Sequence, residues 1–369
     1  MQFIVELFGD LFGNVMNFTW QQGVMIAIGA ILVFLAIKKE MEPTLLLPMG
    51  FGAIIVNLPG VPAHAIETLF NAGIANELFP LLLFIGIGAM IDFGPLLSNP
   101  KMFLFGGAAQ FGIFFTLVVA TLLGFDLKDA ASVGIIAAAD GPTSIYVANT
   151  FKSNYTGAIM VAAYSYMALV PIIQPPIIKA ITTKKERQIR IEYTPSNVSK
   201  ATRIIFPVAV TIIAAAVAPE SAELIGFLMF GNLIRECGVL DNLSQTAQRE
   251  LANLITILLG ISVAFSMRAE SFVQWQTLLI LGLGLVGFVF DTVGGVFFAK
   301  FLNLFSKKKV NPMIGAAGIS AFPMASRMVH KMGQQEDPYN FLLMHAAGAN
   351  VSGQIASVIA GGLILALVG

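Results

Sequence analysis

Residues 129–150 read DAASVGIIAAADGPTSIYVANT, an apolar stretch with an aspartate, Asp140, at its centre. A carboxylate in the middle of a membrane-spanning helix costs roughly 2.5–3.5 kcal/mol on insertion scales. Pro142 lacks a backbone N–H and Gly141 weakens a helix, so carbonyl groups near 137–139 lose their partners. Carboxylate and carbonyl oxygens suit a hard cation such as Na⁺. The stretch therefore predicts a helix broken at a cation site; the alternative is an aspartate that caps the turn at a helix end.

The composition is that of a membrane protein. Only 11% of the 369 residues are charged and 57% are hydrophobic, whereas a soluble domain carries roughly 25% charged residues. The net charge of zero argues against a nucleic-acid partner, because phosphate binding requires clustered cations. The single cysteine, Cys237, excludes an internal disulfide and a thiolate metal cluster. The segment 1–21 has two acids and no Lys or Arg, which favours an interfacial segment over a cleavable signal peptide.

The apolar runs predict an all-α, polytopic membrane protein of about ten or eleven transmembrane helices. Two shorter stretches, 62–74 and 221–236, are too brief or too polar to be assigned as crossing, and re-entrant or interfacial positions stay open for them. The predicted spans lie near 22–38, 43–58, 77–97, 102–124, 129–150, 155–182, 200–218, 246–267, 275–304, 311–332 and 338–368.

A polar basic loop, 183–203, divides the chain into two membrane repeats, 22–182 and 204–369. Each repeat has one segment interrupted by Gly and Pro, at 137–143 and at 318–323. Paired interruptions at corresponding positions are typical of the binding site of a transporter. If the short stretches cross the membrane, the repeats run parallel; if they do not, the repeats are inverted. We favour inverted repeats, because two crossed broken helices require opposite orientations.

Two basic regions indicate the cytoplasmic side. One is the loop with Lys184, Lys185, Arg187 and Arg190, and the other is the run Lys307-Lys308-Lys309. If the repeats are inverted, the positive-inside tendency is violated somewhere in the chain.

The second interruption supplies complementary polar groups. Asn311 opens the segment, Ser320 lies at the break, and Arg327 follows seven residues later. Beside an unwound backbone, Ser320 becomes a candidate oxygen ligand or proton carrier, although a hydroxyl that packs between helices is equally expected. Arg327 is either an anchor at the membrane interface or a guanidinium that receives a carboxylate from water.

Three further polar side chains lie within apolar runs. Tyr164 and Tyr166 are two residues apart and therefore face different sides of a helix, so one can reach the site while the other packs. Asn350 is a candidate amide ligand, with an interhelical hydrogen bond as the alternative.

Several motifs, taken together and in order, resemble the β-subunit of the sodium-transporting, biotin-dependent decarboxylases of the oxaloacetate, methylmalonyl-CoA and glutaconyl-CoA types. The resemblance runs from about residue 65 to the C-terminus. It rests on the stretches ADGPT (139–143), AYSYMALVP (163–171), QPPI (174–177), GNLIRECGV (231–239) and GISAFPM (318–324).

The resemblance implies a membrane subunit that decarboxylates carboxybiotin on a carrier protein, exports Na⁺ and consumes a proton. It implies inverted repeats, and a scaffold that forms homo-oligomers in a prokaryotic inner membrane. The partners would be a carboxyltransferase α-subunit, the biotin carrier and a small membrane γ/δ-subunit. The implied functional positions are Asp140, Tyr164, Tyr166, Asn311, Ser320, Arg327 and Asn350.

From these positions we expect one Na⁺ near Asp140 and Asn311 and another near Ser320 and Asn350. Arg327 would hold the carboxylate of carboxybiotin, and Tyr166 or Ser320 would deliver the proton. Tyr164 would lie with Arg327 in the part of the site that receives biotin.

The chain departs from the family pattern at two places. Ala137-Ala138 replaces a Gly-Gly pair before the first break, and Ala347 and Ala349 replace Met and Pro near Asn350. These changes affect the expected ligand geometry and leave the oxygen ligands in place. Two other classes of function stay open: a plain secondary transporter and a non-catalytic membrane anchor. Neither would release CO₂ from carboxybiotin.

Overall fold

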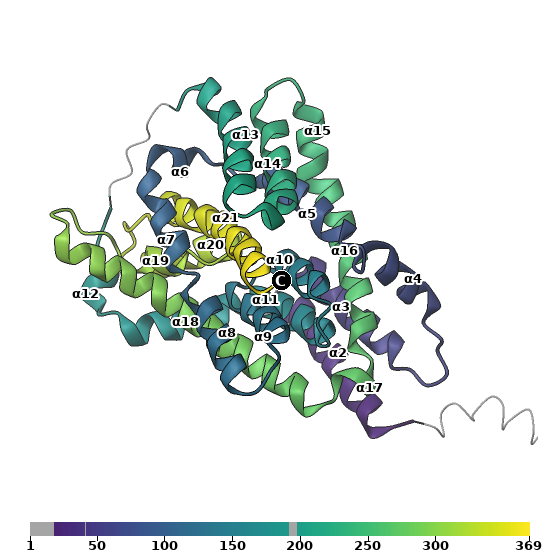
Figure 1. The fold of residues 1–369 in the computed structure, drawn as a ribbon. Coiled ribbons are helices and arrows are strands. Elements are labelled where there is room, and N and C mark those ends of the chain that lie inside the picture. Colours follow the sequence, from purple (N-terminus) through teal and green to yellow (C-terminus); the bar gives the residue numbers. More distant parts are fainter. Residues whose placement is uncertain (1–17, 41, 192–197) are drawn as a thin grey trace, which may run out of the picture. The chain divides into compact units, whose positions relative to one another are not determined.

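The computed structural model describes residues 18–40, 42–191 and 198–369, and within these ranges the chain forms helices and no strand (Figure 1). Seven helical stretches are long and apolar enough to cross a membrane, and His64–Gly73 with Leu78–Met90 adds an eighth if that pair is one span. The predicted all-helical membrane class is confirmed, whereas the predicted ten or eleven spans stay a prediction. The predicted interfacial segment lies almost wholly outside the described residues. The seven stretches are Trp20–Lys38, Pro100–Leu122, Thr156–Ile181, Lys200–Val217, Asp241–Met267, Trp275–Phe305 and Leu343–Val368.

Many of the observed helices begin or end at local signals such as Pro, Gly or a capping side chain. In chain order they are α2 (Trp20–Lys38), α3 (Pro43–Val56), α4 (His64–Gly73), α5 (Leu78–Met90), α6 (Gly94–Ser98), η1 (Pro100–Met102), α7 (Phe103–Ala108), α8 (Phe111–Leu122), α9 (Leu127–Gly134), η2 (Ile135–Ala138), α10 (Gly141–Thr150), α11 (Thr156–Ile181), α12 (Lys184–Arg187), α13 (Lys200–Val217), η3 (Pro219–Ser221), α14 (Ala222–Glu236), α15 (Asp241–Thr246), η4 (Ala247–Leu251), α16 (Ala252–Val263), η5 (Ala264–Met267), α17 (Ala269–Phe272), α18 (Trp275–Phe305), α19 (Met313–Ala316), α20 (Met324–Glu336) and α21 (Leu343–Val368).

The chain divides into two compact units, and the first contains residues up to Phe79 together with Asn253–Leu279. In this unit α2 and α3 pack closely, since a Cβ at Gly29 would lie 2.7 Å from the carbonyl oxygen of Gly50. Small residues at such a crossing let two helix backbones approach, which is how helices associate in lipid. Asn57 then ties the end of α3 to the Met267 carbonyl, 2.8 Å away.

The second unit, Pro80–Ala252 with Ile280–Gly369, contains both interrupted segments. The first segment folds back on itself instead of continuing as one span. The Asp129 carboxylate, at the start of α9, accepts hydrogen bonds from the Ser153 hydroxyl (2.7 Å) and the Asn154 backbone N–H (3.1 Å), just after α10. Because both ends lie together, α9, η2 and α10 form a helical hairpin, which we call the N-hairpin (residues 127–150).

The second interrupted segment folds back in the same way. Asn311, before α19, and Asn340, after α20, both donate side-chain hydrogen bonds to the Arg187 carbonyl, at 2.8 and 2.9 Å. We call the segment between them the C-hairpin (residues 313–336). The sequence predicted 129–150 and 311–332 as interrupted spans, whereas in the structure each segment reverses direction at its interruption.

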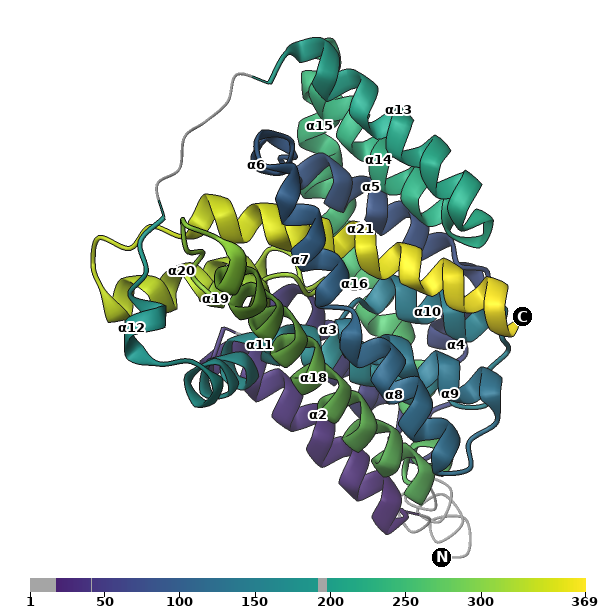
Figure 2. The same cartoon turned by 60° about the vertical axis from the view of Figure 1, so that its left-hand side comes forward.

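The helix α11 connects the bases of the two hairpins. It begins two residues after Asn154 and ends six residues before Arg187. The hairpins therefore open at opposite ends of α11, and their tips meet: the Ser320 N–H donates to the Ala138 carbonyl at 3.2 Å. Figure 2 shows α9 and α10 on the right, α19 and α20 on the left, and α21 running past both.

Candidate functional site

Asp140 lies at the tip of the N-hairpin, where the chain changes direction. Ala139 adopts a left-handed conformation (φ 51°) that ends η2, and Asp140 is extended. Its carboxylate accepts a hydrogen bond from the Thr143 N–H at 3.2 Å, which makes it the N-cap of α10. Pro142 follows in the first turn, where a missing N–H costs little. In the structure Asp140 therefore lies where the helix is interrupted and also caps the helix that follows.

One oxygen of this carboxylate, Oδ2, accepts hydrogen bonds from three side chains that are distant in the sequence. Asp140 Oδ2 accepts hydrogen bonds from the hydroxyls of Ser320 (2.8 Å) and Ser357 (2.6 Å), and from the Gln354 amide (3.0 Å). The two serine hydroxyls also bond each other at 2.9 Å. Asp140 is 3% exposed, and no Lys, Arg or His in the described ranges forms an ion pair with it.

Two more predicted site residues, Asn350 and Tyr164, contact neighbours of this cluster and have side-chain oxygens without a partner in the described ranges. The Asn350 amide donates to the Ile319 carbonyl at 2.7 Å, next to Ser320, and leaves its own oxygen without a hydrogen-bond partner in the described part of the chain. The Tyr164 hydroxyl is likewise buried with no partner there. The Tyr164 ring packs on Gly141 so closely that a Cβ at Gly141 would come within 2.2 Å of it. Glycine is therefore needed at this position for steric reasons.

Two other predicted residues have different contacts. The Tyr166 hydroxyl donates to the Leu281 carbonyl of α18. The Asn311 oxygen accepts from the Met313 N–H, and its amide joins the Arg187 and Ile189 carbonyls. Asn311 thus fixes the base of the C-hairpin, and none of its hydrogen bonds joins it to Asp140.

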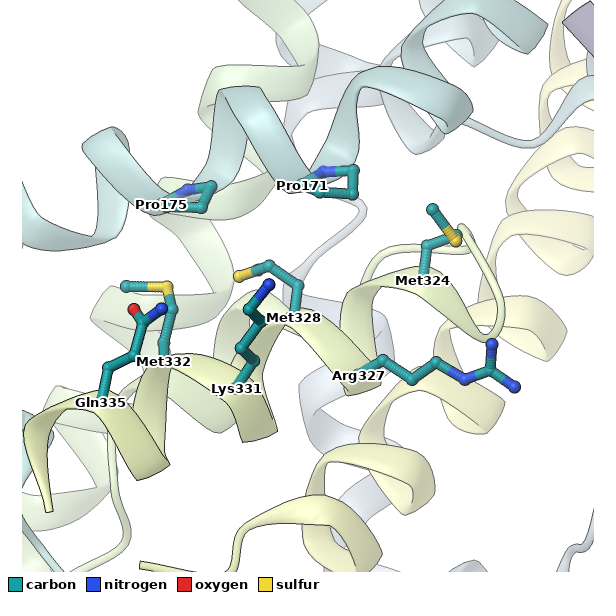
Figure 3. A pocket seen from close by; sticks show the side chains of 8 residues that line it. All are labelled: Pro171, Pro175, Met324, Arg327, Met328, Lys331, Met332 and Gln335. Atoms are coloured by element: carbon teal, nitrogen blue, oxygen red, sulfur yellow. The ribbon is translucent and has the colours of Figure 1, made fainter. Parts of the chain in front are cut away.

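Arg327 lies one turn into α20, between two cavities. One cavity, of about 450 Å³, lies between α20 and α11, and a smaller one of about 220 Å³ includes Asp92 and Pro95. Figure 3 shows Lys331 directed from α20 toward α11, with Arg327 extending away from the two prolines. Both cations are exposed. The larger cavity is lined by Pro171, Pro175, Met324, Arg327, Met328, Lys331, Met332 and Gln335.

Gln354 and Ser357 are site residues that the sequence analysis missed. Their spacing could have revealed them, because they lie four and seven residues after Asn350 and so share one face of α21. Apart from this spacing, no local feature singles out either residue, since each lies in a regular helix with no break.

The cluster at the hairpin tips can bind a small cation. It combines one carboxylate with hydroxyl, amide and carbonyl oxygens, all buried, and hard cations prefer such ligands. A carboxylate buried in its charged form requires a positive partner or a proton. Because the ligands come from both hairpins and α21, movement of either hairpin would change the site.

Fold and site together define a polytopic α-helical membrane protein with a buried carboxylate where two broken helices meet. The chain matches the family described as the Na⁺-transporting oxaloacetate decarboxylase beta subunit over residues 21–368, and it belongs to this family.

Curated relatives agree with this assignment. The chain is 49% identical over 355 residues to the glutaconyl-CoA decarboxylase subunit beta of Acidaminococcus fermentans. The matched region covers 95% of this chain and 94% of the relative. The chain is 48% identical to the methylmalonyl-CoA decarboxylase subunit beta of Veillonella parvula, with 95% and 94% covered. It is 42% identical to the oxaloacetate decarboxylase beta chain of Haemophilus ducreyi, with 99% and 98% covered. The resemblance found in the sequence is thus confirmed, and the chain is a membrane subunit of a decarboxylase.

Proposed function

We propose that this subunit decarboxylates carboxybiotin on a carrier protein and couples the release of CO₂ to Na⁺ export, with consumption of one proton. The observation that carries the proposal is the Asp140 carboxylate, which is buried at the contact of the two hairpin tips and bonded to Ser320 and Ser357. Occupancy of this single carboxylate by Na⁺ or by a proton would link ion movement to the chemistry.

The Na⁺ ligands we propose are Asp140, Ser320 and Asn350. Ser320 bonds the carboxylate directly, and Asn350 donates its amide to the Ile319 carbonyl while its own oxygen has no partner among the described residues. Gln354 and Ser357 complete the set from α21. Asn311 was predicted as a ligand; its contacts support a role in holding the C-hairpin at the position where Ser320 reaches Asp140.

We propose that the cavity between α20 and α11 receives the carboxylated biotin ring. Its methionines and prolines offer an apolar wall, while Arg327 and Lys331, four residues apart on α20, both line the cavity and can neutralise a carboxylate. Both are exposed, so a biotin on a carrier protein can reach them. Biotin is bound covalently to that partner and is the substrate of this subunit.

Loss of CO₂ breaks the bond between the ureido nitrogen and the carboxyl carbon and leaves the electron pair on nitrogen, which then takes up a proton. Of the two predicted donors, Ser320 belongs to a hydroxyl pair that ends on Asp140. The Tyr166 hydroxyl donates to Leu281. We therefore propose that the path by which the proton reaches the ureido nitrogen runs closer to Ser320 than to Tyr166.

We further propose that the repeats are inverted and that the subunit lies in a prokaryotic inner membrane. The support is the entry of the two hairpins at opposite ends of α11. A carboxyltransferase α-subunit, a biotin carrier and a small membrane γ/δ-subunit would complete the complex, with further copies of this chain as neighbours.

The test is Asp140→Asn in the assembled complex in proteoliposomes. The amide keeps a hydrogen-bond acceptor but has no charge, so we expect loss of both Na⁺ uptake and Na⁺-stimulated release of CO₂ from carboxybiotin. Asp126→Asn is the matched control, because Asp126 is an exposed acid just before the same hairpin. Full coupled activity of Asp140→Asn would remove Asp140 from the mechanism. If the unsubstituted complex released no CO₂ from carboxybiotin, the alternative of a non-catalytic membrane anchor would be favoured.

A further inference from the structure

A second buried carboxylate, Asp291, lies outside the Asp140 cluster. The helix that follows α7 restarts at Phe111 as α8, and the first N–H groups of a helix have no partner within it. Asp291 of α18 is the partner of one of these N–H groups, because its Oδ1 accepts a hydrogen bond from the Gly112 N–H. Asp291 is 0% exposed. It therefore caps α8 from a different helix, deep inside the unit.

This cap uses only half of the carboxylate. Asp291 Oδ2 has no hydrogen-bond partner among the residues that the structure describes, and neither does the Thr116 hydroxyl, one turn further along α8. The two residues, Asp291 and Thr116, both lie in the contact between α8 and α18. A Cβ at Gly287, one turn before Asp291, would come within 2.1 Å of the Thr116 oxygen, and Gly112 packs on the Gly287 carbonyl.

The Asp291 region adjoins both hairpins. Gly287 also faces Ala137 of the N-hairpin, and Gly295, one turn after Asp291, packs on Gly315 of the C-hairpin. A polar link reaches the C-hairpin as well: the Gln174 amide donates to the hydroxyl of Thr292 at 3.1 Å and to the Ala316 carbonyl at 2.9 Å.

The Gln110 amide makes a second polar link to the C-hairpin. It lies at the break between α7 and α8 and donates to the Gly318 carbonyl at 3.4 Å, while its own oxygen has no partner in the described ranges. Thus Asp291, Thr116 and Gln110 are each 3% exposed or less, and each has a side-chain oxygen without a partner in the described ranges.

We propose that Asp291 binds a Na⁺ ion of its own, through Oδ2, with the Thr116 hydroxyl as a second ligand. The N-terminal end of α8 carries only about half a positive charge, and no Lys, Arg or His in the described part of the chain pairs with Asp291. A small monovalent cation supplies the missing charge, and the free oxygens are the hard ligands that such a cation prefers. The site is additional to the ions proposed near Asp140.

The test is equilibrium binding of radioactive Na⁺ to the purified full-length chain in lipid nanodiscs, with no carrier protein present. Asp291→Asn keeps an oxygen that can accept from Gly112 but removes the charge, so we expect the bound Na⁺ to fall by one ion per chain. Binding of the same number of ions with unchanged affinity would overturn the proposal.

A second variant distinguishes the loss of a Na⁺ ligand from misfolding of the Asp291→Asn chain. Thr116→Val preserves the shape of the side chain and removes the free hydroxyl, and we expect a several-fold weaker affinity for one ion. Thr121→Val on the same helix is the control, since Thr121 is exposed and its hydroxyl bonds the Leu117 carbonyl. Equal affinities in the two threonine variants would contradict a Thr116 ligand. Because Asp140→Asn is measured separately by coupled activity, the two proposals can fail independently.

Discussion

At the scale of single residues, the chemistry of Asp140 depends on hydroxyls that α21 brings to it. The shortest of its side-chain hydrogen bonds is the one from Ser357, at 2.6 Å, and Ser357 also bonds Ser320. A hydroxyl in this position can bind Na⁺ with its lone pairs and can donate to the carboxylate when Na⁺ leaves. Ser357 should therefore influence Na⁺ affinity without changing the charge of the site.

Ser357→Ala should raise the Na⁺ concentration for half-maximal CO₂ release by roughly 10-fold, the size of effect expected when a supporting group at an ion site is removed. The measurement is Na⁺-dependent decarboxylation by the assembled complex. Ser352→Ala is the matched control, because Ser352 lies on the same helix and its hydroxyl bonds, among the described residues, only the Met102 and Ala349 carbonyls. An unchanged Na⁺ requirement in Ser357→Ala would show that its hydroxyl is not a ligand.

At the scale of secondary-structure elements, the base of the C-hairpin is held by ion pairs with the loop after α11. The Arg187 guanidinium donates to Glu336 at 2.7 Å, and the two side chains are only 12% and 14% exposed. Arg190 pairs with Asp337, but Arg190 is 60% exposed. The Arg190 hydrogen bonds hold the pKa of Asp337 below its ordinary value of 3.8, so this outer pair persists at neutral pH and is lost only in stronger acid.

Arg187→Gln and Glu336→Gln, singly and together, should show a coupling of about 1–2 kcal/mol in the free energy of unfolding, because the pair is charge-assisted and largely shielded from water. Denaturant unfolding in detergent measures it. The pair Arg190→Gln with Asp337→Asn is the control and should couple more weakly, since solvent screens an exposed cation. Additive effects of the Arg187 and Glu336 substitutions would show that the pair does not hold the hairpin.

At the scale of the whole molecule, the hairpin bases define which chain segments share a membrane face. The 26-residue helix α11 is about 39 Å long, enough to cross a hydrocarbon core of about 30 Å. Lys185 and Lys309, from the two basic regions, line one cavity together with Lys300. The two regions therefore lie on one side, at the C-terminal end of α11, whereas the base of the N-hairpin lies at its N-terminal end.

We accordingly expect cysteines at Lys185 and Lys308 to react with an impermeant thiol reagent from the same side of the membrane, and a cysteine at Lys128 to react from the opposite side. Lys128 is exposed at the start of α9. The substitutions are made in a Cys237→Ser background, since Cys237 is the chain's single cysteine. Labelling of all three from one side would exclude the proposed inverted arrangement.

The sequence by itself determined the features that local chemistry controls. It predicted the helical class, most helix positions and both breaks, because apolar runs, prolines and capping residues act within a few positions of the chain. It also singled out Asp140, Ser320 and Asn350, since a polar group in an apolar run requires an explanation. The family resemblance followed from the same motifs.

Only the tertiary structure decided that the broken segments turn back, and which side chains meet Asp140. The hydrogen bonds that settle this join Asp140 to Ser320 and Ser357, which are 180 and 217 positions away. Ser357 has no local signal, and Asn311 was predicted beside Na⁺ but contacts Arg187 and Ile189. The physical reason is that a hydrogen bond depends on which helix faces pack together, and that packing is a property of the whole fold.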